Sequence, residues 1–384
     1  MYIFLSIVYL IVAYISGKYA SKANTPKTYW KYVFYPIIVY SIMYGFRYGW
    51  MIDFNLYEEE YRRLAHDDEK GKLGWIFYCI FRVGSLNGIN YNIIITFLNF
   101  LLIVSYCCIT FYYRKYAQWI LPLFYFVSRM TANFIAFYPA IGFFSLFMVV
   151  FLQTERKIYL RSIRDKKFWI SVLLLLIAFG LHPAVIVALG FFLIVCIIRL
   201  KPTYAILCYL LSFAFQTETW LSVMEYASTY LILYTSNDTI NAYNYYAENA
   251  ESFYSTHSFT GRSSPIFFYI RNCIANSAAF ILYYQYTVKN NLDIYKTKIL
   301  ELATVALVLT NMTEGVELFQ RYAMLYRTFL PILYSYAVAY GLKSYKKTER
   351  FMAIVIIILI GQYYISDAFF APNDNYKFLY IWDI

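Results

Sequence analysis

The chain of 384 residues is 61% hydrophobic, 22% aromatic and only 14% charged, and its formal net charge is +11. Soluble domains are nearer half apolar and a quarter charged, so this composition excludes an ordinary soluble domain. No soluble segment carries a basic stripe with interleaved aromatic residues, which argues against nucleic acid and favours anionic membrane lipid as the partner of the excess positive charge.

Apolar runs recur from end to end of the chain, separated by short charged loops. Because a membrane helix needs about 20 apolar residues, we predict an all-α polytopic membrane protein with about 12 transmembrane helices, forming one integral membrane domain over residues 1–384. The first run lacks the charged start and cleavage site of a signal peptide, so we expect it to be retained. The predicted spans are 2–16, 31–46, 91–111, 117–129, 132–152, 168–181, 184–200, 202–216, 264–287, 297–312, 320–341 and 351–368.

Lysine and arginine are distributed unevenly between the two sets of alternating loops. One set consists of 17–31, 112–118, 153–168, 199–201, 288–298 and 342–350. It holds 21 of the 33 basic residues but only 4 of the 22 acidic residues. The positive-inside rule makes this side cytoplasmic and puts both termini outside. The outer side then carries the loop 47–90 with an interfacial or re-entrant helix near 75–89, the turn 312–320, the tyrosine-rich loop 217–263 and the tail 371–384.

Several arginines map to the outer half of the predicted bilayer, although no short motif joins them. They are Arg47, Arg129, Arg262, Arg271, Arg321 and Arg327. An ionisable group inside a span costs about 2.5 kcal/mol or more, so it usually faces a cavity or a partner. Guanidinium groups match phosphate oxygens, and the set therefore favours a phosphate or pyrophosphate site. The alternatives are snorkelling to headgroups and local ion pairs, such as Arg321 with Glu317 or Arg62 with Glu58. Glu314 is a further acid on this side.

Asp53, His182 and, less strongly, the run Glu58–Glu60 are candidate general bases. Asp53 lies near the membrane boundary, where partial desolvation favours a carboxyl group that accepts protons. His182, in the stretch FGLHPAV, is placed at a turn inside a hydrophobic hairpin and titrates near neutrality. A histidine in such a place can equally be a phosphate donor or a packing residue. The neighbouring run Glu58–Glu60 is most simply a solvated helix face.

Other residue types give weaker signals. The 45 tyrosines are expected in interfacial belts, and those in NAYNYYAENAESFY (241–254) are also suited to stacking on sugars. The six cysteines have no metal-ligand spacing and resemble small buried hydrophobes. We find none of the nucleotide-, metalloprotease- or serine-hydrolase motifs, so we predict a site without metal or cofactor.

At five places the sequence resembles the EpsG-like polysaccharide polymerases, relatives of the Wzy-type O-antigen and capsule polymerases. The matching stretches are FRYGWMIDFNLYEEEY (Arg47, Tyr48, Asp53, Tyr57), EKGKLGWIFYCIF, SRMTANFIA (Arg129), GLHPAVIV (His182) and ELFQRYAML (Arg321, Tyr322). The chain departs from the family pattern at Met51-Ile52, where Gly-Thr is usual, and at Met130, where a polar residue is usual.

The resemblance implies a glycosyltransferase of the bacterial inner membrane whose active site faces the periplasm or exterior. Its substrate would be an undecaprenyl-pyrophosphate-linked oligosaccharide, polymerised without metal, and the resemblance leaves room for a chain-length regulator as a partner. The arginines would hold the pyrophosphate, and His182 or Asp53 would act as the base. Substrate contacts would come from Tyr48, Tyr57, Arg262, Glu314, Glu317 and Tyr322. A lipid-linked oligosaccharide flippase and a membrane O-acyltransferase remain the alternatives.

Overall fold

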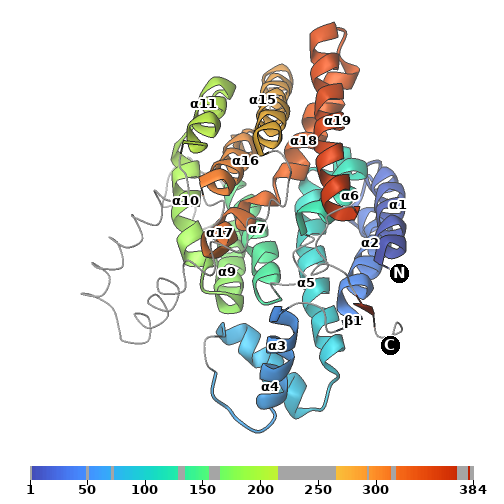
Figure 1. The fold of residues 1–384 in the computed structure, drawn as a ribbon, viewed down its shortest axis with the longest axis vertical. Coiled ribbons are helices and arrows are strands. Elements are labelled where there is room, and N and C mark those ends of the chain that lie inside the picture. Colours follow the sequence, from blue (N-terminus) through green and yellow to red (C-terminus); the bar gives the residue numbers. More distant parts are fainter. Residues whose placement is uncertain are drawn as a thin grey trace, which may run out of the picture.

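The computed structural model describes residues 2–48, 52–70, 73–128, 135–154, 165–214, 265–291, 294–312, 317–369 and 379–380. Within these ranges the protein is all-α apart from one short pair of strands (Figure 1). The helices are α1 (Tyr2–Ala20), α2 (Pro26–Gly45), α3 (Ile52–Arg63), α4 (Trp75–Leu86), α5 (Tyr91–Tyr112), the 3-10 turn η1 (Arg114–Tyr116), α6 (Ala117–Ser128), α7 (Phe137–Leu152), α9 (Lys166–Leu181), α10 (Val185–Ile197), α11 (Pro202–Ser212), α15 (Pro265–Lys289), α16 (Ile294–Met312), α17 (Glu317–Arg327), α18 (Leu330–Lys343) and α19 (Lys347–Phe369).

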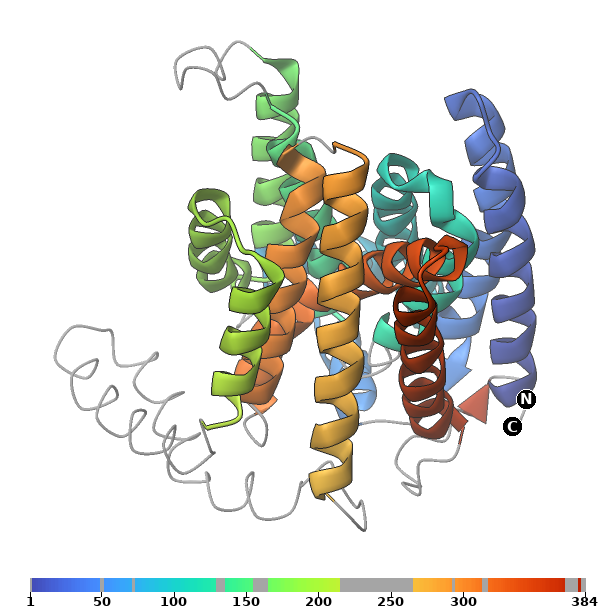
Figure 2. The same ribbon diagram turned by 90° about the horizontal axis from the view of Figure 1, so that it is seen from above.

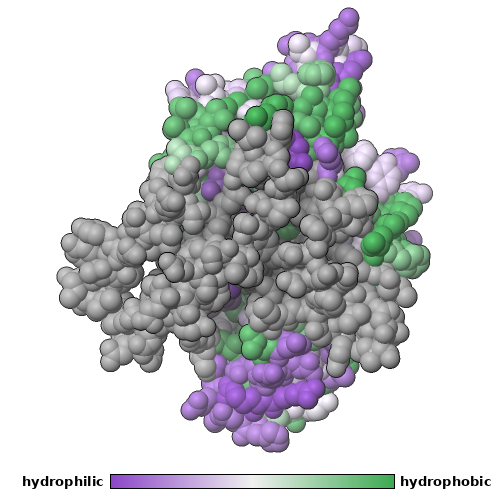
Figure 3. Space-filling model, viewed as in Figure 1, coloured by the Kyte–Doolittle hydropathy of each residue, from purple (hydrophilic) through white to green (hydrophobic). Residues whose placement is uncertain are grey.

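The helices pack around one continuous hydrophobic core. Figures 1 and 2 show α1, α2 and α6 along one flank, α9, α10 and α11 along the opposite flank, and α15, α16 and α18 between them. Along the chain, α5 packs on α2 and α7, and α7 packs on α9. The lobe formed by α3 and α4 (Ile52–Leu86), which we name the α3–α4 lobe, lies at one end, and its visible surface is hydrophilic (Figure 3).

By length and composition, two of the described helices could cross a membrane. They are residues Ile3–Ala20 of α1 and Tyr91–Tyr112, which is α5. The helices α4, α7, α10 and α11 are apolar but shorter. The expectation of about 12 spans therefore stays a prediction for the remaining helices.

Most predicted spans correspond to one helix whose ends differ by a few residues. α2 begins five residues earlier than expected because Thr25 caps its first turn: the Thr25 hydroxyl oxygen accepts from the Thr28 N–H at 3.2 Å, and Pro26 follows at the first helical position. The predicted span 320–341 is instead two helices, α17 and α18, separated at Thr328-Phe329. Pro331, in the first turn of α18, lacks the N–H that a continuous helix would need.

Tyrosines contribute much of the interior and also join helices. Ten of them are among the largest fully buried side chains. The hydroxyl of Tyr9 donates to the Leu121 carbonyl at 3.2 Å, that of Tyr29 to the Cys107 carbonyl at 2.8 Å, and that of Tyr125 to the Ser6 hydroxyl at 2.7 Å. A buried phenol must find such a partner, so each contact fixes one helix against another. The interfacial belts expected from the sequence therefore account for only part of the tyrosine content.

The cysteines are all free. The expectation that they behave as small buried hydrophobes is wrong for Cys79 on α4 and Cys208 on α11, which are exposed.

The strands pair two distant segments. β1 (Arg47–Tyr48) runs antiparallel to β2 (Leu379–Tyr380), with Arg47 opposite Tyr380 and Tyr48 opposite Leu379. The backbone of the predicted outer loop 47–90 thus pairs with that of the predicted outer tail 371–384, which supports their assignment to the same side.

Candidate functional site

His182 occupies the turn between α9 and α10. Its backbone is extended, as expected for a residue before proline, and its N–H closes α9 on the Ala178 carbonyl at 3.0 Å. The imidazole Nδ1 accepts the N–H of Ala184 at 3.2 Å, and the ring lies edge-to-face on Phe137 of α7, with ring centroids 4.9 Å apart. The ring is therefore held by two contacts, and in the neutral imidazole the proton sits on Nε2.

Arg321, in the first half of α17, lies close enough to His182 for its positive charge to act on the imidazole. Two residues 139 positions apart in the sequence thus lie within electrostatic reach of each other. We refer to them as the His182–Arg321 pair.

Three contacts hold α17 in place beside the turn. The Tyr326 hydroxyl donates to the Ala188 carbonyl of α10, the helix that begins just after His182. Thr328, after the last turn of α17, forms a 2.7 Å hydroxyl contact with Ser145 of α7. Arg327 Nε donates to the Thr310 hydroxyl of α16 at 3.1 Å. Elements α7, α10 and α16 therefore all hold α17 in place.

The N-terminus of α4 closes on the same turn. A Cβ atom at Gly74 would lie 2.4 Å from the Leu181 carbonyl and 2.5 Å from the Gly180 carbonyl, so only glycine permits this approach. The positive end of the α4 dipole meets the negative end of α9. The α3–α4 lobe is therefore positioned directly beside His182.

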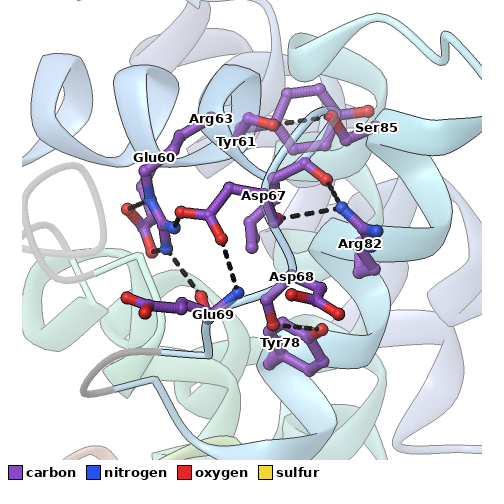
Figure 4. Close-up of polar contacts among 10 residues, drawn as sticks. Glu60, Tyr61, Arg63, Asp67, Asp68, Glu69, Tyr78, Arg82 and Ser85 are labelled. Atoms are coloured by element: carbon purple, nitrogen blue, oxygen red, sulfur yellow. Dashed lines mark hydrogen bonds and ion pairs between the residues drawn. The ribbon is translucent and has the colours of Figure 1, made fainter.

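A polar network stiffens the α3–α4 lobe (Figure 4). Arg63 binds Glu60 at 2.7 Å, the carboxylate of Asp67, and the Glu69 carbonyl at 2.7 Å. Arg82 of α4 donates to the carbonyl oxygens of Leu64 and Asp67. The Glu69 N–H, and after it the Arg63 guanidinium, hold the pKa of Asp67 below its usual value.

On the outer face of the same lobe, Glu58 pairs with Arg62 at 2.6 Å. The local ion pair expected from their spacing is confirmed. The run Glu58–Glu60 lies on a helix, α3, as expected, but only Glu59 is exposed, because Glu58 and Glu60 pair with arginines.

Arg327 and Arg271 are partly buried. Arg327 lies six positions after Arg321, which on a helix means about 9 Å along the axis and faces about 120° apart. The two arginines therefore face different neighbours: Arg321 lies near the α9–α10 turn, and Arg327 donates to Thr310. Arg271 lies in the first third of α15.

The remaining predicted site residues are placed in part. Tyr57 packs edge-to-face between Phe77 and Phe81 of α4, at 5.5 and 6.2 Å between ring centroids. Tyr322 is half-buried on α17 against the core. For the others only the backbone is described: Arg47 and Tyr48 form β1, Asp53 lies in the first turn of α3, and Glu317 begins α17.

Some predictions fall outside the described residues. These are Arg129, Arg262, Glu314, the loop 217–263 with its stretch 241–254, and all of the tail 371–384 except 379–380.

Sequence reasoning missed a buried polar chain between helices. Asn276 of α15 donates to the Tyr209 hydroxyl of α11 at 3.0 Å and accepts from the Tyr334 hydroxyl of α18 at 2.6 Å. Asn311 of α16 donates to Ser212 of α11 at 2.9 Å. Isolated asparagines within apolar runs were the available signal, because a buried amide needs partners.

Over the ranges that the structure describes, no group of three or more histidine, cysteine or acidic side chains could hold a metal ion.

Comparison with known proteins gives no relative. No family model matches the chain, and neither a curated protein nor a solved structure matches it.

Proposed function

We propose that this protein is a polytopic membrane glycosyltransferase that polymerises undecaprenyl-pyrophosphate-linked oligosaccharide repeat units on the outer face of the bacterial inner membrane. The observation that carries the proposal is the placement of α17, which carries Arg321, against α10 just after His182, beside the α3–α4 lobe. A cation and an imidazole in a partly buried turn form a site for phosphate oxygens.

In the proposed reaction, the bond between the anomeric carbon and the pyrophosphate oxygen breaks, and its electron pair leaves with the lipid pyrophosphate. The acceptor hydroxyl oxygen bonds to the same carbon and releases its proton to a base. Arg321 stabilises the charge that grows on the leaving pyrophosphate, which is the form of electrostatic stabilisation that contributes most in many enzymes. The leaving group needs no metal if enough guanidinium groups approach it.

The hydrogen bonding of His182 favours a donor role over a base role. Its Nδ1 already accepts the Ala184 N–H, so the neutral ring presents Nε2–H to the site. That N–H suits a phosphate oxygen, and the proton of the acceptor hydroxyl then goes to another group. Asp53 is our candidate, since α3 belongs to the lobe that closes on the turn.

The arrangement of the loops supports the membrane topology on which this proposal depends. The lobe contacts the end of α9, and β1 pairs with the outer tail, so segments that are all expected outside are joined to one another. Residues from three loops expected inside, 112–118, 288–298 and 342–350, gather in one place around Tyr116, Tyr286 and Tyr340.

The test is polymerisation in vitro. The purified protein would be reconstituted in vesicles with the lipid-linked repeat unit of its own host and no added metal or nucleotide, and the products would be separated by length. We expect a ladder of lengthening oligosaccharides together with free undecaprenyl pyrophosphate. Movement of the intact unit across the bilayer without lengthening would support a flippase, and transfer of an acyl group would support an O-acyltransferase; either result would contradict the proposal.

A further inference from the structure

A second group of cationic residues lies on the side of the predicted membrane opposite to His182. Three exposed lysines point over tyrosine rings there: Lys115 over Tyr116 and Tyr286, each at 5.5 Å from the ring centroid, Lys289 over Tyr340 at 5.7 Å, and Lys343 over Tyr116 at 6.0 Å. We name these six residues the lysine–tyrosine cluster. They come from η1 and from the last turns of α15 and α18.

The tyrosines form a firm base beneath the lysines. Tyr116 and Tyr286 are buried, and Tyr336 lies against both, with ring centroids 4.6 and 5.0 Å away. Tyr340 joins this group 6.2 Å from Tyr286. Since the rings are fixed by packing, the ammonium groups above them are gathered in one small area.

The three lysines of the cluster carry more positive charge than the one neighbouring carboxylate can neutralise. None of the ion pairs that the structure gives for its described residues includes Lys115, Lys289 or Lys343. The acid on the neighbouring helix is Glu349, which binds Lys346 at 3.3 Å and accepts from the hydroxyls of Ser344 and Tyr340, so one carboxylate does border the cluster. Three ammonium groups over aromatic rings therefore form a suitable binding site for an anion, and lysine is a common phosphate ligand.

Apolar side chains border the lysines. Val288 precedes Lys289 in the chain and is 59% exposed, and Leu342 precedes Lys343 and is 44% exposed. Tyr345, two positions beyond Lys343, is 98% exposed. A soluble anion gains nothing from such a border, whereas a lipid can place its phosphate on the lysines and its acyl chains on the apolar residues.

We propose that the lysine–tyrosine cluster binds the headgroup phosphate of an anionic glycerophospholipid in the cytoplasmic leaflet. The inference rests on the proposed membrane topology, which puts all three lysines on the cytoplasmic side, but it does not depend on the polymerase activity. Bound lipid would join η1, α15 and α18, three elements that belong to distant parts of the sequence.

The experiment uses the full chain in a neutral detergent, with thermal unfolding as the readout. Short-chain phosphatidylglycerol, short-chain phosphatidylcholine, inorganic phosphate and a polyglutamate peptide are titrated separately. We expect saturable stabilisation by phosphatidylglycerol alone. The variant K115Q/K289Q/K343Q should bind it about 10-fold more weakly, and K289Q alone about 3-fold, because each lysine contributes part of the attraction to an anionic headgroup.

The matched control is K18Q/K22Q/K27Q, which removes three exposed lysines from another loop on the same predicted side. It should change the apparent affinity less than about 2-fold. Equal loss in both triple variants, or equal stabilisation by phosphatidylcholine, would mean that no specific site exists. Equal stabilisation by inorganic phosphate would assign the site to a soluble anion, and stronger stabilisation by the peptide would assign it to a protein partner; either would overturn the proposal. None of these readouts involves polymer synthesis, so the lipid site and the proposed function can fail separately.

Discussion

At the scale of single residues, the His182–Arg321 pair combines two donors of different character. The guanidinium keeps its charge at any working pH and offers a fork of N–H groups. The imidazole, held by Ala184 and Phe137, presents one N–H in a fixed direction. Both suit an anion whose charge increases during the reaction, and their roles can be separated by substitution.

Arg321→Ala should lower kcat for polymerisation about 100- to 1000-fold, because it removes a donor aimed at the charge that develops in the transition state. The kcat of Arg321→Lys should lie between those of the parent and Arg321→Ala, since lysine keeps the charge but loses the forked pair of N–H donors. Arg62→Ala is the control, because Arg62 makes an exposed ion pair on the lobe worth about 0–1 kcal/mol. Product ladders from reconstituted protein would measure this, and a normal ladder from Arg321→Ala would remove the pyrophosphate role.

His182→Gln distinguishes a donor from a base. Glutamine keeps an N–H but cannot take up a proton at neutral pH. We expect His182→Gln to retain kcat within about 10-fold and His182→Ala to lose about 100-fold. Single-turnover rates of the parent and both variants would provide the measurement. Equal losses in the two variants would restore His182 as the base.

At the scale of elements, two glycines allow the α3–α4 lobe to pack closely against the other helices. Gly74 and Gly180 let the start of α4 approach the end of α9 until backbone and side chains touch. Interior packing transmits small displacements, so a change at this contact should reach the His182–Arg321 pair without altering either residue.

Gly74→Ala should push α4 away from the turn. The new Cβ would lie 2.4 Å from a backbone carbonyl oxygen, and overpacking of this kind costs about 1–3 kcal/mol. We expect a lower unfolding temperature and reduced activity. Gly190→Ala is the control: it lies on α10, where a Cβ meets nothing within 4 Å, and it should be neutral or stabilising. If both alanine variants unfold at the parent's temperature and keep its activity, the lobe does not position the site.

A buried ion pair on α16, Lys298 with Glu301 at 3.8 Å, forms hydrogen bonds to the backbone at the end of α10. Lys298 donates to the Val195 carbonyl at 2.7 Å and to that of Ile198, and Glu301 accepts the Leu200 N–H at 3.1 Å. Lys298→Met would leave the Glu301 carboxylate without this neighbouring cation, at a cost of about 3 kcal/mol.

The double variant K298M/E301L should recover much of that loss, because a buried pair replaced by apolar residues of similar size is often neutral. Thermal unfolding in detergent would compare the parent, the single variant and the double variant. A single variant as stable as the parent would show that the pair does not hold these helices together.

At the scale of the whole molecule, the positions of the helices along the sequence could be predicted better than the way the helices pack on one another. Apolar runs located α5 and α7 to within a few residues because burial, or a bilayer, requires such runs whatever the fold. The break between α17 and α18 could be anticipated only from Pro331. The β1–β2 pairing could not, since it depends on where the chain's far end returns.

The candidate site was predicted in part. Charge counting assigned Arg321 and His182 to one side, but it could not show that α17 lies against the α9–α10 turn, which the Tyr326–Ala188 contact determines. Nor could it show that Arg327 faces Thr310 instead. Such contacts depend on how each helix is rotated about its own axis. A helix with apolar residues on all faces gives no sequence signal for that rotation.

The sidedness of the molecule decides which chemistry the His182–Arg321 pair can serve, and cysteine labelling tests it. In a background with the six native cysteines replaced, single cysteines would be placed at Glu59 on the lobe and at Lys22 and Lys346 in loops expected inside; all three positions are exposed. A maleimide that cannot cross membranes should label position 59 in intact cells and the other two only after lysis, because the positive-inside rule puts the basic loops in the cytoplasm.

The reversed pattern would place Arg321 and His182 in the compartment that contains nucleotide sugars. A lipid pyrophosphate would then no longer be the natural donor, and the substrate class would have to change. Labelling of all three positions in the soluble fraction of broken cells would contradict both proposals. The protein would then not be a membrane protein, and the lysine–tyrosine cluster would have no leaflet to bind. Labelling of position 59 alone in intact cells would place the α3–α4 lobe and the His182–Arg321 pair on the outer face, as the proposed polymerase requires.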